Sequence, residues 1–474
     1  MAEDVDVVVV GMGPGGEHVA GRAAEAGLDV VGVEPRLLGG ECPYWACVPT
    51  KMMVRAGNLL AEARRIPGMA GTARVTPDWA PVADRIRNEA TDDWTDQAAV
   101  DRFTKQGGRF VRGHGTLTGP RTVRVAGPDG QEFRARRGVV LATGTSPRIP
   151  PIPGLADAPF WTNREAVAAT EAPESLVVLG GGPVGVELAQ VFARFGTRVT
   201  VVESGDHLLH MEEPEAGALV GDALRADGVT VHTGARAERV THSDDGFTMS
   251  LTGGAEVAGE RLLVATGRDP GLDRLGLETV GLDPAARSVP TDGQLRAGDG
   301  LWAIGDVTGH GAFTHVAMYQ AEIAVRDLLG EPGPPADYRA VPRVTFTDPE
   351  VGAVGLTEAQ ARERIRDVRT GLAKLPATSR GWIHKAGNEG FLKLVADADR
   401  GVLVGATSAG PTGGETLYGL VVAVQAEVPV ARLRHAIFAF PTFHRGVEDA
   451  LRELGPPPGP GGLGGTPDGA PDGR

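Results

Sequence analysis

Cysteine is almost absent from this 474-residue sequence, which contains only two, and basic residues are outnumbered by acidic ones, 47 to 61. Two cysteines cannot staple a disulfide-rich scaffold, and they fit a reducing compartment. The net charge of −14 argues against a nucleic-acid partner and against attraction to an anionic membrane surface. No apolar run reaches the ~20 residues of a membrane span. The acidic segment 1–4 leads straight into a strand pattern, so we expect no export signal and a cytoplasmic protein.

The two cysteines, Cys42 and Cys47, have four residues between them in a segment bounded by glycine and proline. Two thiols at this spacing can close a small disulfide ring at the start of a helix, where the helix N-terminus lowers a cysteine pKa. The alternative is two buried cysteines that only pack. Their concentration in one segment, with Lys51 close behind, favours a redox-active pair.

A strand–helix–strand pattern precedes the cysteines. Residues 5–10 and 28–33 are apolar strand patterns, residues 17–26 are a helix pattern, and Glu34 ends the second strand. The turn after the first strand reads G-x-G-x-x-G, in which the glycines permit a tight turn, approach of a pyrophosphate and close helix packing. A carboxylate at Glu34 is placed to bind ribose hydroxyls. The glycines of this first dinucleotide motif are Gly11, Gly13 and Gly16.

The same pattern occurs again further along the chain. Residues 175–179 and 197–202 are strand patterns, residues 186–195 are a helix pattern, and Glu203 follows the second strand. Two copies imply two dinucleotides, the combination that a flavin–nicotinamide enzyme needs. Glu203 would repel a 2′-phosphate, and no arginine follows closely, so NADH is favoured over NADPH. The glycines of this second motif are Gly180, Gly182 and Gly185.

Residues 39–51 resemble the GG-T-C-x4-C-[IV]-P-[ST]-K signature of the flavin-dependent pyridine nucleotide–disulfide oxidoreductases. That family includes dihydrolipoamide dehydrogenases, glutathione reductases and mercuric reductases, and the resemblance extends from about residue 5 to about residue 454. It implies FAD at the first motif and NAD(P)H at the second. It also implies that Cys47 is the thiol nearer the flavin and that Cys42 exchanges with substrate. A Lys51–Glu187 pair beside the flavin and nicotinamide is a further implication.

Three shorter stretches also resemble the family. Residues 142–144 and 265–270 resemble its two A-T-G motifs, and residues 305–306 resemble the Gly-Asp that ends a late strand. The family uses that aspartate to hold the flavin ribityl hydroxyls. In the following helix we expect His315 to be a core histidine rather than a catalytic one. The binding residues implied by these stretches are Thr143, Gly144, Gly267 and Asp306.

The resemblance implies an α/β fold with two Rossmann-like dinucleotide-binding domains, for FAD and NAD, and a C-terminal α+β dimerisation domain. In the family this last domain forms a two-fold dimer over the partner's disulfide, so we expect a homodimer. Lys51 to about Gln97 is predicted to be helical. The expected boundaries are 1–147 and 273–335 for the FAD domain, 148–272 for the NAD(P) domain, 336–454 for the dimerisation domain and 455–474 for a disordered Gly/Pro tail.

The sequence departs from the family where disulfide-reducing members carry H-P-x-x-x-E. Phe440 stands at the histidine position and Arg445 at the glutamate position, and a phenyl ring cannot transfer a proton. His444 is either a replacement acid/base or an ordinary surface or interface histidine. With no third cysteine, mercury delivery is disfavoured, and we expect no bound metal.

Three functions remain open at this point. The first is reduction or oxidation of a small disulfide or dithiol substrate, in the manner of dihydrolipoamide dehydrogenase. The second is an NAD(P)H:quinone or other electron-acceptor reductase, favoured by Phe440 and by an apolar face that includes Trp45. The third is a flavin-bearing redox sensor. Tyr44 and Trp45 replace the smaller residues common between the family's cysteines, and they either shield the disulfide or bind substrate.

Overall fold

The computed structural model describes residues 2–126 and 130–456 and has an α/β fold. It divides into two compact units, Met1–His210 with Val220–Tyr338, and Met211–Leu219 with Arg339–Arg474. From residue 457 on, the expected Gly/Pro tail lies outside the described residues. Within the described part, no helix has the length and apolar character needed to cross a membrane.

The larger unit is built on a sheet whose centre is β1 (Glu3–Val10). The valine run of β1 is buried because strands pair in parallel on both of its sides and other elements cover both of its faces, which is where continuous apolar runs belong. The order along the sheet is β16 (Arg296–Gly298), β17 (Leu301–Ala303), β6 (Gln131–Leu141), β1, β2 (Val30–Glu34) and β3 (Arg109–Arg112), with the antiparallel strands β4 (His114–Gly119) and β5 (Thr122–Ala126) added through β6.

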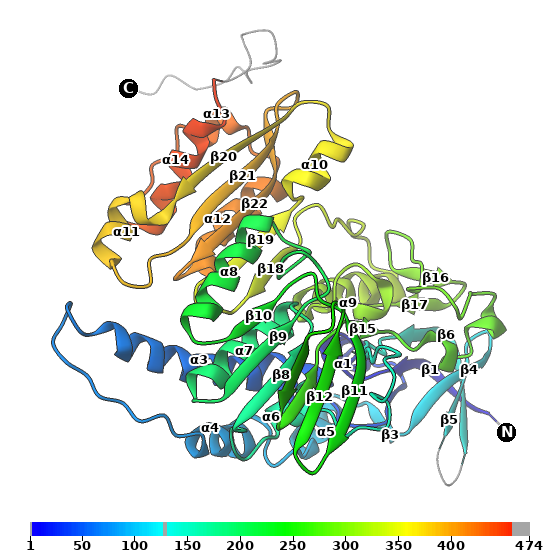
Figure 1. Cartoon of the computed structure of the whole chain (residues 1–474). Helices are drawn as coiled ribbons and strands as arrows, with labels where there is room; N and C mark the ends of the chain where they lie inside the picture. Colours follow the sequence, from blue (N-terminus) through cyan, green and yellow to red (C-terminus); the bar gives the residue numbers. More distant parts are fainter. Residues whose placement is uncertain (1, 127–129, 457–474) are drawn as a thin grey trace, which may run out of the picture. The chain divides into compact units, whose positions relative to one another are not determined.

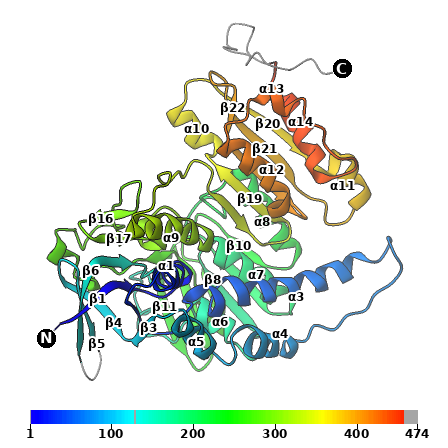
Figure 2. The same ribbon diagram turned by 180° about the vertical axis from the view of Figure 1, so that it is seen from behind.

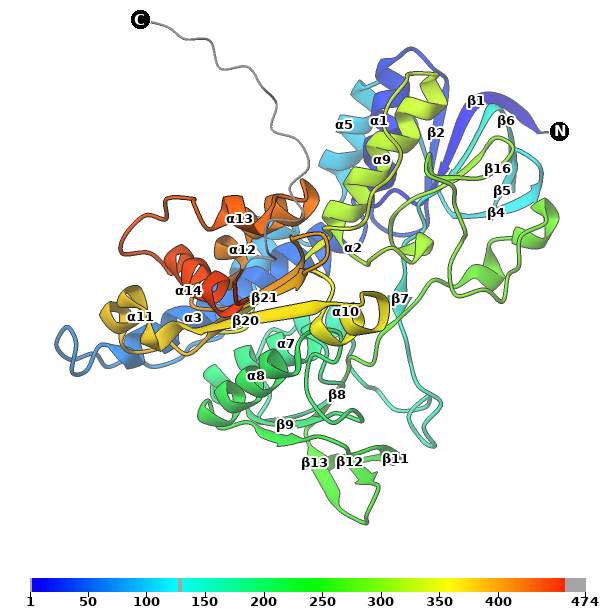
Figure 3. The same ribbon diagram turned by 90° about the horizontal axis from the view of Figure 1, so that it is seen from above.

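Helices α1 (Pro14–Glu25), α5 (Gln97–Lys105) and α9 (Thr314–Leu329) pack on one face of this sheet, and Figure 3 shows them next to β1 and β2. Val7 and Val9 of β1 point into that core. Alternate valines of β1 point into a second core on the opposite face, which includes β4, β5 and the segment around residues 272–289. The period-2 alternation of strand side chains produces this division.

A second parallel sheet carries the second glycine motif. Its order is β10 (Thr230–His232), β9 (Arg198–Val202), β8 (Ser175–Leu179) and β14 (Arg261–Val264), and α7 (Pro183–Arg194) follows β8. A three-stranded antiparallel sheet of β11 (Ala237–Ser243), β12 (Gly246–Leu251) and β13 (Glu256–Gly259) packs against it, as Figure 1 shows. Between residues 146 and 269 the chain also forms the helix α8 (Pro214–Ala226) and the shorter elements β7 (Ser146–Pro147), α6 (Asn163–Val167) and β15 (Arg268–Asp269).

The long helix α3 (Cys47–Arg65) packs on α7, and both are visible in Figure 2. Gly57 leaves room for Arg194 of α7, whose guanidinium donates to the side chain of Asn58 at 2.7 Å. The prediction of helix from Lys51 to Gln97 is wrong beyond Arg65, because Pro67 and positive-φ glycines interrupt it. Helix resumes as α4 (Ala80–Arg85), the π-helix η1 (Ile86–Ala90) and then α5.

The smaller unit is a five-stranded antiparallel sheet with helices α12 (Gly413–Gln425) and α14 (Gly446–Glu453) packed on its apolar face. The strand order is β18 (Pro342–Thr345), β19 (Glu350–Gly355), β22 (Val402–Gly410), β21 (Phe391–Asp397) and β20 (Val368–Lys374). Shorter helices are α10 (Glu358–Arg364), α11 (Ser379–His384), α13 (Val430–Leu433) and the 3₁₀-helix η6 (Phe443–Arg445).

A buried lysine fixes the segment Met211–Leu219 to this sheet. The ammonium of Lys393 on β21 is 2.9 Å from Glu213, 2.7 Å from Glu215 and 2.9 Å from Glu358. Lys393 and Glu213 are both almost fully buried. A buried charge is tolerated only when it is paired and hydrogen-bonded, so this lysine holds three separate chain segments together.

Replacing Lys393 by methionine, which keeps the side-chain volume, leaves the Glu213 carboxylate buried without its cation. We expect a loss of about 3 kcal/mol in the free energy of unfolding, measured by urea denaturation. The control is Arg366→Met, which removes an exposed ion pair with Asp399 and is expected to cost less than ~1 kcal/mol. Equal losses in the two variants would contradict this role of Lys393.

Candidate functional site

The two glycine motifs have nearly the same geometry. Gly11 and Gly180 have φ of +94° and +114°, and a Cβ on either would meet a carbonyl oxygen of the A-T-G segments at 2.3 or 2.4 Å. A Cβ on Gly16 or on Gly185 would lie 2.0 Å from the carbonyl oxygen of the first glycine of its own motif. The turns therefore close only with glycine at these four positions.

The middle glycines serve a different purpose. Gly13 and Gly182 have ordinary φ values of −68° and −75°, and a Cβ on either would meet no heavy atom of the described residues within 4 Å. They stand at the N-termini of α1 and α7 and face open space. Backbone amides at a helix N-terminus attract phosphate groups, so both places fit a pyrophosphate.

Each motif is completed by a glutamate at the end of its second strand. The Glu34 carboxylate accepts hydrogen bonds from the amides of Met12 and Arg36, both at 3.0 Å. Glu203 accepts from the amide of Gly181 and from that of the residue two positions after itself, both at 2.6 Å. Burial raises the pKa of Glu34. Both carboxylates are thus fixed beside the glycine turns, where they fit the ribose hydroxyls of a dinucleotide.

The A-T-G segments run alongside these turns. The hydroxyl of Thr143 is buried and has no hydrogen-bond partner among the described residues. Such buried polar groups are normally satisfied, so this one fits contact with a bound molecule. Gly144 and Gly267 have φ of +64° and +122°, and a Cβ on either would meet no described atom within 4 Å.

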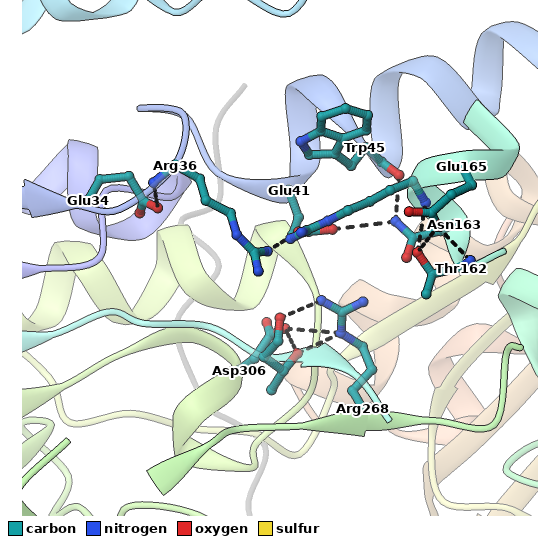
Figure 4. A network of polar contacts seen from close by, with 11 residues as sticks. Glu34, Arg36, Glu41, Trp45, Thr162, Asn163, Glu165, Arg268 and Asp306 are labelled. Carbon is teal, nitrogen blue, oxygen red and sulfur yellow. Dashed lines mark hydrogen bonds and ion pairs between the residues drawn. The ribbon is translucent and has the colours of Figure 1, made fainter. Parts of the chain in front are cut away.

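Asp306 lies in the 3₁₀-helix η4 (Gly305–Thr308) after β17. Its carboxylate accepts a hydrogen bond from the Thr145 hydroxyl at 2.7 Å and is 3.9 Å from the Arg268 guanidinium (Figure 4). Arg268 also donates to the Thr145 side chain at 2.6 Å and to its carbonyl at 2.7 Å. Sequence reasoning noted Arg268 only as part of a motif, whereas the structure brings it to Asp306.

Both cysteines are thiols in the structure. Cys42 belongs to the short helix α2 (Glu41–Tyr44), and Cys47 is the first residue of α3, as the spacing predicts. The Cys47 sulfur lies 3.4 Å from the hydroxyl of Thr314 at the start of α9. Hydrogen bonds from Cys42 and Thr314, with the charge of Lys51, lower the pKa of Cys47 to about 6. The pKa of Cys42 is raised, because Cys42 is hydrogen-bonded to Cys47 and is partly buried.

Lys51 and Glu187 are brought together as expected. The Lys51 ammonium on α3 lies 2.7 Å from a carboxylate oxygen of Glu187 on α7, and the glutamate side chain is only 5% exposed. Lys51 stands four residues after Cys47, one helical turn along α3. The pair therefore connects the helix that begins with the reactive thiol to the helix of the second glycine motif.

Some site residues differ from expectation or were missed. His315 is exposed and stacks on Phe313 at 5.1 Å, so the expectation of a core histidine is wrong, because the first turn of α9 leaves that side outside the core. Thr314 was missed, since a threonine beginning a helix gives no sequence signal of contact with Cys47. Trp45 is half-buried and stacks on Trp94.

The C-terminal unit contains the remaining candidates. Phe440 is 66% exposed, and the Arg445 guanidinium lies 5.6 Å from the centre of its ring. His444 is exposed on η6. Among residues 2–126 and 130–456, no group of three or more His, Cys, Asp or Glu side chains is arranged to hold a metal ion.

Residues 5–321 match the family model described as pyridine nucleotide-disulphide oxidoreductase, and residues 341–451 match the dimerisation domain of that family. The chain belongs to this family. FAD and NAD(P)H are the cofactors of this family, and the open glycine turns, the two glutamates and the unsatisfied Thr143 hydroxyl fit them. The matched dimerisation domain indicates a homodimer.

Known relatives fall into more than one functional group. The chain is 34% identical to a dihydrolipoyl dehydrogenase of Chlorobaculum tepidum, over 96% of this chain and 99% of that protein. It is 30% identical to a mercuric reductase of Staphylococcus aureus, over 94% of this chain and 81% of that protein.

Two solved structures are similar over almost the whole chain. One is a Cu(II) complex of RclA, an HOCl-induced flavoprotein disulfide reductase from Escherichia coli, with a TM-score of 0.83, 27% identity and coverage of 95% and 99%. The other is LpdA from Mycobacterium tuberculosis, with a TM-score of 0.82, 27% identity and coverage of 95% and 100%. The comparisons show a flavoprotein disulfide oxidoreductase and leave its substrate open.

Substituting alanine for Gly182 tests the second dinucleotide site. The methyl group meets no protein atom but occupies the space where the pyrophosphate approaches, so folding and flavin content should be unchanged. We expect the KM for NADH to rise about tenfold or more, since one misplaced contact costs this much. Gly185→Ala is the contrasting variant, because its Cβ clashes with backbone and should lower the melting temperature. A Gly182→Ala variant with unchanged KM would contradict the placement.

Substituting valine for Thr314 tests the hydroxyl beside Cys47. In the dithiol enzyme, Cys47 is ionised above pH about 6, so its reaction with iodoacetamide should be fast at pH 7 and slow at pH 5. Loss of the hydroxyl hydrogen bond removes one stabilising contact of the thiolate, and the midpoint should rise by about one pH unit. Thr314→Ser should keep the parental midpoint. The same midpoint in Thr314→Val would show that the hydroxyl does not stabilise the thiolate.

Proposed function

We propose that this protein transfers two electrons between NAD(P)H and a small disulfide or dithiol substrate through Cys42 and Cys47, in the manner of dihydrolipoamide dehydrogenase. The observation that carries the proposal is the Cys47 thiol, which begins α3, contacts Thr314 and has a pKa lowered to about 6. A purely structural cysteine has no need of such a lowered pKa. The broader activity, that of a flavoprotein disulfide oxidoreductase, is the activity of the family as a whole.

The site residues divide the work in this proposal. The first glycine motif with Glu34, Thr143, Gly144 and Asp306 holds FAD, and the second with Glu203 and Gly267 holds the nicotinamide dinucleotide. Bound FAD supplies the two-electron transfer between the nicotinamide and the protein disulfide. Lys51, oriented by Glu187 at 2.7 Å, would place its positive charge next to the bound flavin. A positive charge there would favour the reduced flavin, which is more negative than the oxidised flavin.

Cys42 and Cys47 carry out the thiol–disulfide exchange with the substrate. Reduction breaks the Cys42–Cys47 bond with two electrons and one proton, which leaves Cys47 as a thiolate and Cys42 as a thiol. Cys42 loses its proton as it attacks one sulfur of the substrate disulfide, and that substrate's other sulfur leaves as a thiol. The Cys47 thiolate then attacks the Cys42 sulfur, restores the protein disulfide and expels the second substrate sulfur as a thiolate, which takes up one proton from solvent. The net reaction consumes NAD(P)H, one proton and one disulfide, and gives NAD(P)⁺ and two thiols.

A second acceptor class is favoured by one specific observation. Phe440 is exposed in the C-terminal unit at the position where disulfide-reducing relatives carry a histidine, and it cannot accept the Cys42 proton. A quinone or a similar electron acceptor needs no such base. His444, exposed nearby on η6, is the candidate that would serve a disulfide substrate in place of the missing histidine.

Further parts of the proposal concern the nicotinamide and the assembly. NADH is preferred to NADPH because the Glu203 carboxylate, 8% exposed, would face a 2′-phosphate. The functional form is a homodimer, and exposed apolar side chains on the C-terminal unit, such as Trp382, Tyr418 and Ile437, support this. The FAD, NAD(P) and dimerisation domains are proposed with the boundaries expected from the sequence, except that Met211–Leu219 of the expected NAD(P) domain groups with the C-terminal unit.

The Cys42→Ala variant separates the two acceptor classes. NADH turnover is measured with lipoamide and with a soluble benzoquinone, on protein of equal flavin content. If the acceptor is a disulfide, the variant should lose about a hundredfold or more of its lipoamide turnover, while quinone turnover is retained. A variant that reduces lipoamide at the parental rate would contradict the proposal.

The Phe440→His variant completes the test. It restores a base at the family position, so lipoamide turnover should rise about tenfold or more, and Phe440→Leu is the matched control. Parental enzyme that turns over quinones but not lipoamide, and that gains nothing from Phe440→His, would favour the electron-acceptor reductase.

A further inference from the structure

The four residues between the cysteines are held from two sides. On the first side, the Tyr44 hydroxyl donates to the carbonyl of Leu38 at 3.1 Å, and the residue is only 7% exposed. Its ring also lies against Gly39, where a Cβ would approach it to 3.1 Å. Tyr44 therefore points into the scaffold, away from solvent, and does not present its ring to a substrate.

On the second side, Trp45 makes three contacts with distant segments. Its indole stacks on Trp94 with ring centres 5.3 Å apart and an interplanar angle of 20°. Its carbonyl accepts a hydrogen bond from the Asn163 side chain at 2.7 Å (Figure 4). The Arg164 guanidinium lies 6.0 Å from the centre of its indole ring. Both the main chain and the side chain of Trp45 are therefore fixed by these contacts.

Arg164 extends these contacts to the other cysteine. Its guanidinium forms an ion pair with Glu41, the residue directly before Cys42, and Asn163 also approaches Glu41 at 3.4 Å. Both residues belong to the short helix α6, which a capping box between Thr162 and Glu165 fixes at its start. The same helix turn therefore holds the chain just before Cys42 and again two residues before Cys47.

Trp94 is placed by an unusual backbone. Asp92, Asp93 and Trp94 have φ values of 48°, 51° and 56°, three successive non-glycine residues in the left-handed region. They follow the π-helix η1 and the buried Thr91, whose hydroxyl donates to carbonyl oxygens of η1. Such strain persists only where the surroundings fix it, and it gathers at functional sites, as π-helical turns do. Here the strained backbone places the indole ring of Trp94 against that of Trp45, which stands between the two cysteines in the sequence.

We propose that Glu41, Trp45, Trp94, Asn163 and Arg164 form a ring clamp that favours the disulfide over the dithiol at Cys42 and Cys47. This deepens the function proposed above and rests on it. Closing a disulfide costs conformational freedom of the chain between the two sulfurs. Because the ring clamp already fixes that chain, less freedom is lost on closure. Trp45 and Glu41 act as positioning residues for the redox pair and not as substrate-binding groups.

The test measures the thiol–disulfide equilibrium of the flavin-loaded protein directly. The protein is equilibrated anaerobically in mixtures of reduced and oxidised dithiothreitol. Two electrons pass from the dithiol to Cys42–Cys47, with release of cyclic oxidised dithiothreitol, and the free thiols are then counted by alkylation and mass. The variants are Trp94→Ala, the conservative Trp94→Phe, and Arg164→Gln. Arg85→Gln is the control, because it removes an arginine of α4 whose ion pair with Glu89 is exposed on the surface.

Trp94→Ala and Arg164→Gln should each lower the equilibrium constant for disulfide formation about tenfold, a potential about 30 mV less negative. Trp94→Phe should regain most of the parental value, and Arg85→Gln should equal it. A shift in either clamp variant at parental flavin content supports the clamp, so a Trp94→Ala variant that fails to fold leaves Arg164→Gln to decide. Parental equilibria in every variant that folds would overturn it. A parental protein whose cysteines NADH does not reduce would instead overturn the proposed function.

Discussion

The ion pair between Lys51 and Glu187 is the contact on which the arrangement of the site depends. Glu187 is almost completely buried on α7, and a buried carboxylate is costly unless it is paired and hydrogen-bonded. Lys51 supplies a cation at 2.7 Å. α3 begins with Cys47, and α7 begins directly after Gly182. The ion pair therefore connects the reactive thiol to the second glycine motif. Loss of either partner would remove the ion pair that joins the two helices.

The electrostatics around the cysteines are asymmetric, and the asymmetry gives the two thiols different roles. The pKa of Cys47 is lowered and that of Cys42 is raised. In a pair that shares one proton, the proton then resides on Cys42 and the negative charge on Cys47. Cys47 is ionised at neutral pH, while Cys42 keeps its proton and needs a base before it attacks a substrate. A phenyl ring such as that of Phe440 cannot act as this base.

The sequence predicted the two nucleotide-binding units well, because their glycines and terminal glutamates obey strong local constraints. The glycine turns close only without side chains at Gly11, Gly16, Gly180 and Gly185, and this steric rule is visible in the sequence. Contacts made by residues distant in sequence were not predictable: Thr314 reaches Cys47 from α9, and Trp94 reaches Trp45 through a left-handed turn of non-glycine residues. The predicted helix is too long because the helical spacing of apolar residues continues in the sequence beyond Pro67 and Gly68, whereas α3 ends at Arg65.

The central claim is that electrons from the nicotinamide reach Cys42 and Cys47. It is tested most directly by anaerobic titration of the purified flavoprotein with NADH, following the visible spectrum. The account predicts that two electrons produce a long-wavelength absorbance band, from the Cys47 thiolate beside oxidised flavin, and that two thiols become available to alkylation. Bleaching of the flavin at two electrons, without that band and without new thiols, would contradict it.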